Sequence, residues 1–182
     1  MHKSFLSIRD ICQIAIFTAV IAVLSPMAIP MPYGVPLTLQ SFIIPFSAVV
    51  LGARRGAVAT IAYVLLGVVG LPVFSGFSGG AGMLIGPTGG FILAFPIYAW
   101  LAGWGADRET PLWRTVGLIS GVVLFFLMGT LYFSLVMGQR LGVALAATVL
   151  PFIPTELLKL LGVWFLGPRV RVTLRRALRQ TG

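Results

Sequence analysis

The residues from which most catalytic and metal sites are built are scarce in this sequence. Its 182 residues include one cysteine, one histidine and four Asp and Glu. Because Cys12 is alone, neither a disulfide framework nor a thiolate metal site can form. The one histidine, His2, is at the amino terminus, and the sequence offers no nucleophile with its base, no metal-ligand cluster and no phosphate-binding loop. We therefore expect no enzyme, no metal and no cofactor.

Charged residues of either sign are also few, and apolar residues take their place. Asp, Glu, Lys and Arg make up 9% of the chain, hydrophobic residues make up 58%, and the mean hydropathy is +1.03. A soluble domain of this size could not bury so much apolar surface. The composition predicts an integral membrane protein, and the length suits one transmembrane domain over residues 1–182.

Six stretches nearly free of charge follow one another along the chain. They cover residues 11–29, 37–52, 56–71, 89–106, 115–137 and 141–167. We predict an all-α bundle of six membrane-spanning helices. The third stretch is shorter than a bilayer core of about 30 Å requires, so its neighbours must shelter it.

Two prolines interrupt the last stretch. Pro151 and Pro154 precede Thr155 and Glu156, and Pro followed by such residues is typical of a helix start. We therefore predict that residues 141–150 form a short re-entrant or interfacial segment, and that the sixth spanning helix begins near Pro154.

The basic residues are distributed unevenly between the two predicted sides of the membrane. Eleven of the 13 Lys and Arg lie at the termini or in the gaps after the second and fourth stretches, whereas Arg140 lies on the opposite side. Lys and Arg accumulate on the cytoplasmic side, so we predict that both termini are cytoplasmic in a multi-pass protein of the cell membrane. The basic residues behind the net charge of +9 then orient the helices and contact membrane lipids. No nucleic-acid partner is implied.

One acid and one amine lie far from every predicted membrane edge. Glu156 and Lys159 are three residues apart, which places both on one helical face. Each costs about 2.5 to 3.5 kcal/mol at a helix centre, so their placement needs a reason. They form a ligand site if Lys159 binds a carboxylate or carbonyl and Glu156 accepts hydrogen bonds from N–H groups. Alternatively, the two charges neutralise each other as a packing device.

Four segments carry a family resemblance. They are PYGVPLTLQ at residues 32–40, GLPVF at 70–74, GPTGGF at 86–91 and LPFIPTELLK at 150–159. In this order, over almost the whole chain, they resemble the BioY family, the biotin-binding S components of energy-coupling-factor (ECF) vitamin transporters. The third segment is the most specific of the four.

The resemblance implies a function and a set of partners. It implies an S component that captures biotin from the outer side and delivers it with an ATPase-driven coupling module. The implied partners are a transmembrane coupling protein (T component) and two ATP-binding-cassette ATPases. The family's acid-x-x-lysine motif falls on Glu156 and Lys159, with Thr155-Glu156 here where many members have Gly-Asp. The longer acid bears on how the ureido group of biotin is held.

The predicted outer loop between the third and fourth stretches, residues 72–88, and Phe74 within it supply further candidate ligand residues. Gly79 and Gly80 would let backbone amides approach a ligand, because glycine has no side chain to obstruct it. Phe74 and Met83 could cover the apolar ring and chain of biotin, and Thr88 offers a hydroxyl. The alternative is a flexible turn whose glycines permit close helix packing.

Two helices carry the remaining candidates. Gln40, early in the second stretch, could hydrogen-bond either ligand or another helix. Ala15 and Ala19 form a small-xxx-small pair on the first helix, which suits either internal packing or, as the resemblance implies, docking on the coupling protein. Two other functions stay open: a stand-alone facilitator for biotin or another small carboxylate vitamin, and a non-transporting membrane assembly protein.

Overall fold

The computed structural model describes residues 7–31 and 35–180. His2, Lys3 and residues 32–34 of the first family segment lie outside the described residues. The elements, in chain order, are α1 (Ile8–Leu24), β1 (Ala28–Ile29), β2 (Leu37–Thr38), α2 (Gln40–Leu51), α3 (Ala53–Val69), a 3-10 turn (Ser75–Phe77), α4 (Gly82–Ile85), α5 (Gly89–Asp107), α6 (Pro111–Met137), α7 (Leu141–Thr148), a second 3-10 turn (Leu150–Phe152) and α8 (Ile153–Gln180).

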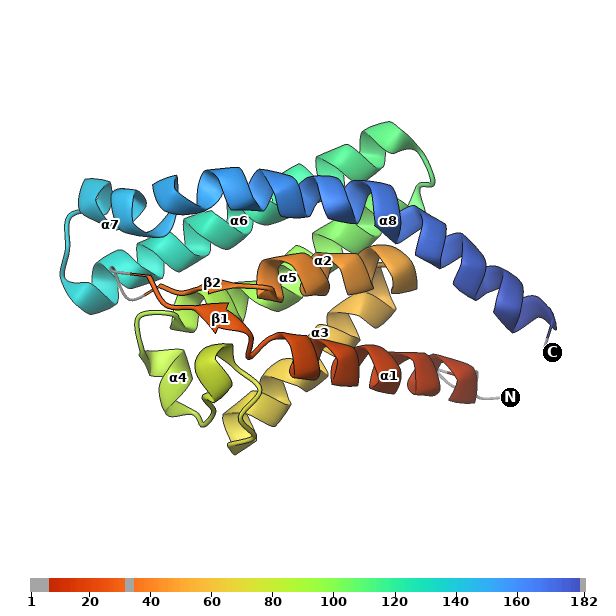
Figure 1. The fold of residues 1–182 in the computed structure, drawn as a ribbon, viewed down its shortest axis with the longest axis horizontal. Coiled ribbons are helices and arrows are strands. Elements are labelled where there is room, and N and C mark those ends of the chain that lie inside the picture. The colour runs from red at the N-terminus through yellow and green to blue at the C-terminus, as the bar shows by residue number, and fades with distance from the viewer. Residues whose placement is uncertain (1–6, 32–34, 181–182) are drawn as a thin grey trace, which may run out of the picture.

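The long helices among the described residues follow the six predicted stretches. They are α1, α2, α3, α5, α6 and α8, and they pack side by side into an elongated bundle (Figure 1). Within residues 7–31 and 35–180, three segments are long and apolar enough to cross a membrane, namely Gly89–Asp107, Pro111–Met137 and Leu141–Leu178. Helix α3 has 17 residues, and α2 has 12 and is almost entirely buried. Of the six long helices, α2 is therefore shorter than α3, and the helices around α2 shelter it.

Two predicted helix ends are wrong. Residues 25–31 and 35–39 are not helical, and Ala28 and Ile29 pair antiparallel with Thr38 and Leu37. Prolines 26, 30 and 36 account for this because proline cannot donate the backbone hydrogen bond that a helix interior needs. At the other end of the chain, α8 continues through Pro168 to Gln180 instead of ending at residue 167.

The start of the last helix follows the prediction. Residues Leu141–Thr148 form the separate short helix α7, a 3-10 turn follows, and α8 begins at Ile153. Thr155 Oγ1 donates to the carbonyl of Phe152 at 2.9 Å. Glu156 consequently lies in the first turn of α8.

Helix α5 occupies the centre of the bundle, in contact with α2, α3 and α6. Small residues make these contacts possible. A Cβ atom added to Gly103 would lie 2.5 Å from the amide nitrogen of Ala53 on α3. A Cβ atom on Gly117 of α6 would lie 2.8 Å from Cα of Gly105 on α5. Such close backbone approach is typical of membrane helices that associate through glycine.

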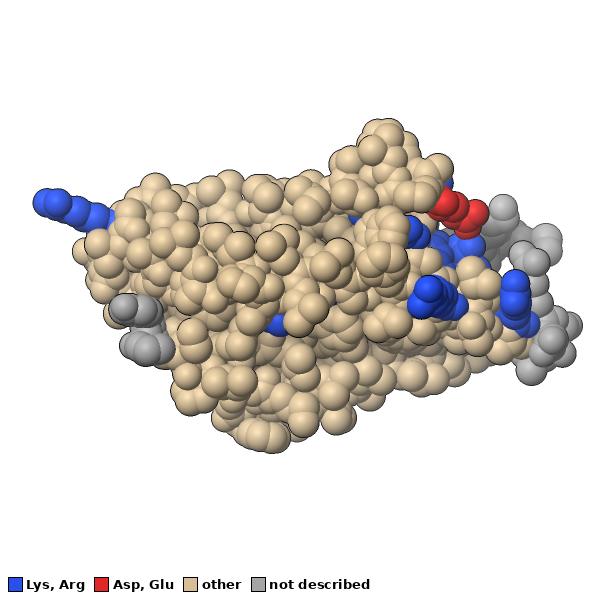
Figure 2. Space-filling view, turned by 45° about the horizontal axis from the view of Figure 1, so that its top comes forward, with Lys and Arg blue, Asp and Glu red and all other residues tan. Residues whose placement is uncertain are grey.

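The start of α1 and the end of α8 lie at one end of the bundle, called here the end with the termini, where Lys and Arg side chains also gather (Figures 1 and 2). Arg171 of α8 donates to Asp107 at 2.6 Å and to the carbonyl of Val49 at 3.1 Å. Asp107 in turn accepts from the amide of Ala53 at 2.9 Å. These bonds join α2, α3, α5 and α8, and they explain why α8 continues beyond residue 167.

A second ion pair holds the same end. Arg175 of α8 donates to Glu109 at 2.6 Å. Its hydrogen bond and positive charge lower the pKa of the Glu109 carboxyl below its ordinary value. Both side chains are about half exposed or more, so the pair adds little to the free energy of unfolding.

The close contact between α5 and α6 predicts that one methyl group added at Gly117 lowers the stability of the protein. Gly117→Ala should lower the stability of the detergent-purified protein by about 1 to 3 kcal/mol, because the added Cβ meets backbone atoms that cannot rotate away. Gly142→Ala on α7 is the matched control, since a Cβ there meets no atom within 4 Å. Melting temperatures of the two variants measure the difference, and equal values would disprove the close contact.

Candidate functional site

A cavity lies at the end of the bundle opposite the termini. Its walls come from the entry to α2, the loop between α3 and α5, and helices α5, α6, α7 and α8. The polar lining residues are Thr38, Gln40, Ser41, Ser75, Thr88, Thr148, Glu156 and Lys159; the apolar ones are Val35, Pro36, Phe74, Met83, Phe91, Ile92, Phe95, Phe125, Phe126 and Phe152.

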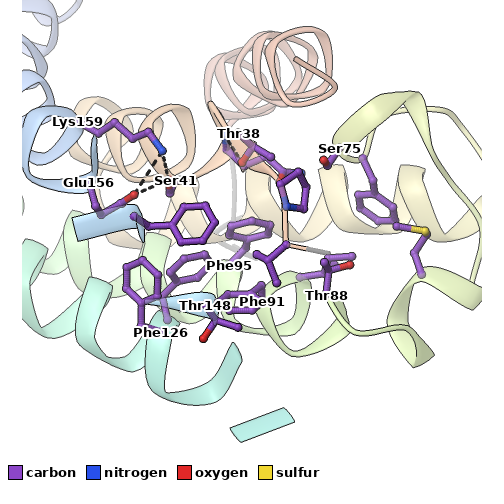
Figure 3. A pocket seen from close by; sticks show the side chains of 18 residues that line it. Thr38, Ser41, Ser75, Thr88, Phe91, Phe95, Phe126, Thr148, Glu156 and Lys159 are labelled. Carbon is purple, nitrogen blue, oxygen red and sulfur yellow. Dashed lines mark hydrogen bonds and ion pairs between the residues drawn. The ribbon is translucent and has the colours of Figure 1, made fainter. Parts of the chain in front are cut away.

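Three side chains form a hydrogen-bonded cluster at one end of this cavity (Figure 3). Ser41 Oγ donates to Glu156 Oε2 at 2.8 Å, and Lys159 Nζ donates to Ser41 Oγ at 2.9 Å. Lys159 Nζ also lies 3.4 Å from Glu156 Oε2. The Glu156 and Lys159 side chains are 6% and 13% exposed, so the pair is largely removed from water.

The cluster retains hydrogen-bonding capacity. Glu156 Oε1 is buried and has no hydrogen-bond partner among the described residues. Lys159 carries three N–H groups, of which the contacts with Ser41 and Glu156 use two. A buried acceptor without a partner costs about 1 to 3 kcal/mol, and more when it is charged. A ligand that supplies an N–H to Oε1 would remove this cost.

Phenylalanines line the middle of the cavity. Phe95 stacks on Phe125 with ring centroids 5.3 Å apart, and Phe91 lies 5.1 Å from Phe125. Phe126 extends the aromatic surface toward Glu156 (Figure 3), and Phe152 also lines the cavity. Phe91 and Phe95 lie one helical turn apart on α5, and Phe125 and Phe126 are adjacent on α6. This surface suits the faces of an apolar ring or an alkyl chain.

A hydrogen-bonded chain fixes the outer loop to the helices. Gln40 Nε2 donates to Tyr63 OH at 2.6 Å, and that hydroxyl donates to the carbonyl of Val73 at 3.2 Å. The Tyr63 ring meets Phe74 edge-on at 5.8 Å. Phe74 is 1% exposed and also packs directly on Gly67 of α3. Gln40 thus lines the cavity and positions its cover at the same time.

Six of the predicted ligand residues line the same cavity. They are Gln40, Phe74, Met83, Thr88, Glu156 and Lys159. Gly79 and Gly80 do not belong to its wall. A Cβ on Gly79 would collide with the carbonyl of Leu71, and Gly80 has a φ of +98° and donates to the carbonyl of Gly67 at 2.7 Å. In this structure both glycines fold the loop against the end of α3.

The predicted docking residues lie elsewhere. Ala15 and Ala19 are exposed on α1, together with Ile11 and Ile16. This exposure leaves this face of α1 accessible to another protein or to lipid.

Several lining residues could not be identified from the sequence. Ser41 is the most consequential, because its hydroxyl on α2 forms hydrogen bonds with both Glu156 and Lys159 of α8. Its only signal is its position beside Gln40 at the start of a predicted helix. The aromatic residues of α5 and α6 give no signal, since phenylalanine is equally common on a lipid-facing surface.

The fold and the cavity define a membrane protein of transmembrane helices with a cavity of polar and aromatic side chains at one end. The model of the BioY family matches residues 1–176. The chain is 38% identical to the biotin transporter BioY2 of Lactococcus lactis subsp. cremoris, with 92% of this chain and 91% of that protein covered. It is 35% identical to the biotin transporter BioY of Thermotoga maritima, with 90% and 96% covered.

A solved structure has the same fold. The S-component for biotin from an ECF-type ABC transporter superposes with a TM-score of 0.83 over 90% of this chain and 91% of that chain, at 26% identity. The chain belongs to the BioY family. Family membership confirms the predicted helical membrane fold and the prediction of a transport protein rather than an enzyme.

The bonds of Tyr63 predict that its hydroxyl stabilises the loop. Tyr63→Phe should destabilise the protein by about 1 to 3 kcal/mol because Gln40 loses its buried partner. Tyr98→Phe is the matched control, since Tyr98 is equally buried and its hydroxyl has no partner among the described residues. Melting temperatures should fall for Tyr63→Phe and stay level or rise for Tyr98→Phe; the reverse order would contradict the assignment.

Proposed function

We propose that this chain is the biotin-binding S component of an ECF-type uptake transporter, and that it binds biotin in the cavity around Glu156 and Lys159. The observation that carries the proposal is the cluster of Ser41, Glu156 and Lys159, with one buried carboxylate oxygen left to accept an N–H. Relatives over nearly the whole chain are named biotin transporters, which supports the same ligand.

The chemistry of biotin matches the order of groups along the cavity. Its ureido ring has two N–H donors and a carbonyl acceptor, which suit Glu156 Oε1 and the ammonium of Lys159 respectively. The sulfur-containing ring and the alkyl chain suit the surface of Phe91, Phe95 and Phe125. The carboxylate would then reach the hydroxyls of Ser75 or Thr88 at the far end of the cavity (Figure 3).

Charge favours this orientation of the ligand. With Glu156 and Lys159 both charged, the cluster is neutral, so a carboxylate beside Glu156 would introduce a repulsive pair of like charges. The ureido group is uncharged and replaces the lost water contacts of both residues. Hydrogen bonds and apolar contact, rather than net charge, therefore supply most of the affinity.

The uneven distribution of charge supports an orientation in the membrane. The described Arg residues lie mostly at the end with the termini, and Arg140 lies at the other end, between α6 and α7. Lys and Arg favour the cytoplasmic side, so both termini are cytoplasmic and the cavity is near the outer side. Biotin would enter from outside, beneath the loop that contains Phe74 and Met83.

Delivery to the cytoplasm needs partners. The structurally similar S component comes from an ECF-type ABC transporter, which supports a transmembrane coupling protein and two ATPases as partners of this chain. The exposed face of α1 with Ala15 and Ala19 is the proposed contact with the coupling protein, because small side chains let another helix approach closely. Transport by the purified chain alone, without ATPases, would instead identify a stand-alone facilitator.

A calorimetric titration tests the ligand. Biotin added to the detergent-purified chain should bind saturably without any partner, whereas thiamine and riboflavin should give no saturable heat, because neither presents a ureido group with an alkyl carboxylate. Absence of biotin binding in a folded sample would refute the proposed function, and binding of all three vitamins would refute its specificity.

Replacing Lys159 tests the site. Lys159→Ala should weaken biotin binding about 10- to 100-fold, the usual effect of losing a hydrogen bond from a charged donor. Arg140→Ala is the matched control, since Arg140 is exposed at the same end and outside the cavity. Unchanged affinity in folded Lys159→Ala would exclude Lys159 as a ligand residue and leave the charge pair a packing device.

A further inference from the structure

A second cavity with a different chemistry lies at the end of the bundle that carries the termini. It is bounded by the end of α2, the connection between α5 and α6, and α8, and three arginines line it: Arg114, Arg171 and Arg175. Arg171 is paired with Asp107 and Arg175 with Glu109. Arg114 has no carboxylate partner among the described residues, and its guanidinium lies 4.4 Å from the centre of the Trp164 ring. The cavity therefore has an excess of positive charge.

Two guanidinium N–H groups of this cavity lack a hydrogen-bond acceptor. The Nε atoms of Arg114 and Arg171 are buried, and neither has a partner among the described residues. Arg171 is only 7% exposed. Buried N–H groups without acceptors are rare because they have lost water and gained nothing in exchange. Oxygen atoms of a phosphate would satisfy them, and guanidinium groups bind phosphate particularly well.

An apolar groove leads away from this cavity between α6 and α8. Two neighbouring parts of the groove share the lining residues Ile119, Leu157 and Leu160. The groove extends along α6 from Thr115 to Leu131, roughly 24 Å at 1.5 Å per residue. An acyl chain in one leaflet spans about half of the 30 Å hydrocarbon core, so the groove is long enough to hold one.

The groove and the cavity meet at one aromatic residue. Trp164 lines the groove, donates from Nε1 to Thr115 at 3.0 Å, and carries the guanidinium of Arg114 on its ring. Tryptophan is enriched at the level of lipid headgroups. The basic cavity therefore adjoins the apolar groove, just as the phosphate of a phospholipid adjoins its acyl chains.

We propose that one anionic phospholipid binds here, with its phosphate at Arg114, Arg171 and Arg175 and one acyl chain in the groove between α6 and α8. The lipid bridges two helices that otherwise leave a groove between them, and it satisfies the two buried Nε–H groups. The arginine cavity is at the opposite end of the bundle from the biotin cavity, whereas the far end of the groove reaches Phe126 and Glu156, which also line the biotin cavity. The proposal does not depend on the identity of the transported ligand.

Native mass spectrometry of the full chain in detergent tests the proposal. Phosphatidylglycerol should stay bound to higher collision energy than phosphatidylcholine with the same acyl chains, because the cavity has excess positive charge. Arg114→Gln should lower phosphatidylglycerol binding about fivefold, the effect of one basic side chain at an anionic headgroup. Arg140→Gln is the matched control, since Arg140 is exposed at the opposite end, and it should bind as the wild type does.

A groove variant and a soluble anion distinguish the lipid from a free phosphate. Ile119→Trp fills the groove at a residue that is 47% exposed, so it should weaken phosphatidylglycerol binding and leave the lipid-free melting temperature unchanged. Inorganic phosphate should raise the melting temperature less than phosphatidylglycerol does. Three results would each overturn the proposal: equal binding of the two lipids, unchanged phosphatidylglycerol binding in Arg114→Gln, or a rise in melting temperature with inorganic phosphate as large as that with phosphatidylglycerol.

Discussion

Helix α5 can occupy the centre of the bundle because glycine and alanine let its neighbours approach its backbone. Gly103 admits Ala53 of α3, and Gly105 faces Gly117 of α6. Helices in a bilayer gain nothing from hiding apolar surface from water, so close van der Waals contact has to hold them together. A side chain at either glycine would separate helices whose spacing determines the rest of the structure.

The residues that helix α5 presents to its neighbours change along its length, from small side chains at one end to the phenylalanines that line the cavity at the other. Toward the termini α5 presents small residues and packs tightly. Toward the other end it presents Phe91 and Phe95, whose rings meet Phe125 of α6 and line the cavity. Gly129 of α6 receives the Phe91 ring, so this end also depends on a position without a side chain.

Charge inside the bundle is tolerated where a bridging group accompanies it. Ser41 contacts both Glu156 and Lys159, which lowers the cost of burying the pair and also holds α8 against α2. At the opposite end Arg171 joins three helices through Asp107 and Val49. At each end, buried polar atoms have no partner among the described residues: Glu156 Oε1 at one end and the Nε atoms of Arg114 and Arg171 at the other. These atoms are the proposed points of contact with biotin and with lipid phosphate.

The sequence by itself determined the membrane class, the course of six apolar helices and the placement of Glu156 and Lys159 on one face of the last one, because hydropathy, proline positions and helical spacing are local properties. Only the tertiary structure decided that Ser41 lies between the two charges and that four phenylalanines of α5 and α6 face the cavity. It also decided that Gly79 and Gly80 fold the loop and do not line the cavity. Those outcomes depend on how helices pack against one another, and a glycine or phenylalanine carries no local signal of the neighbour that it will meet.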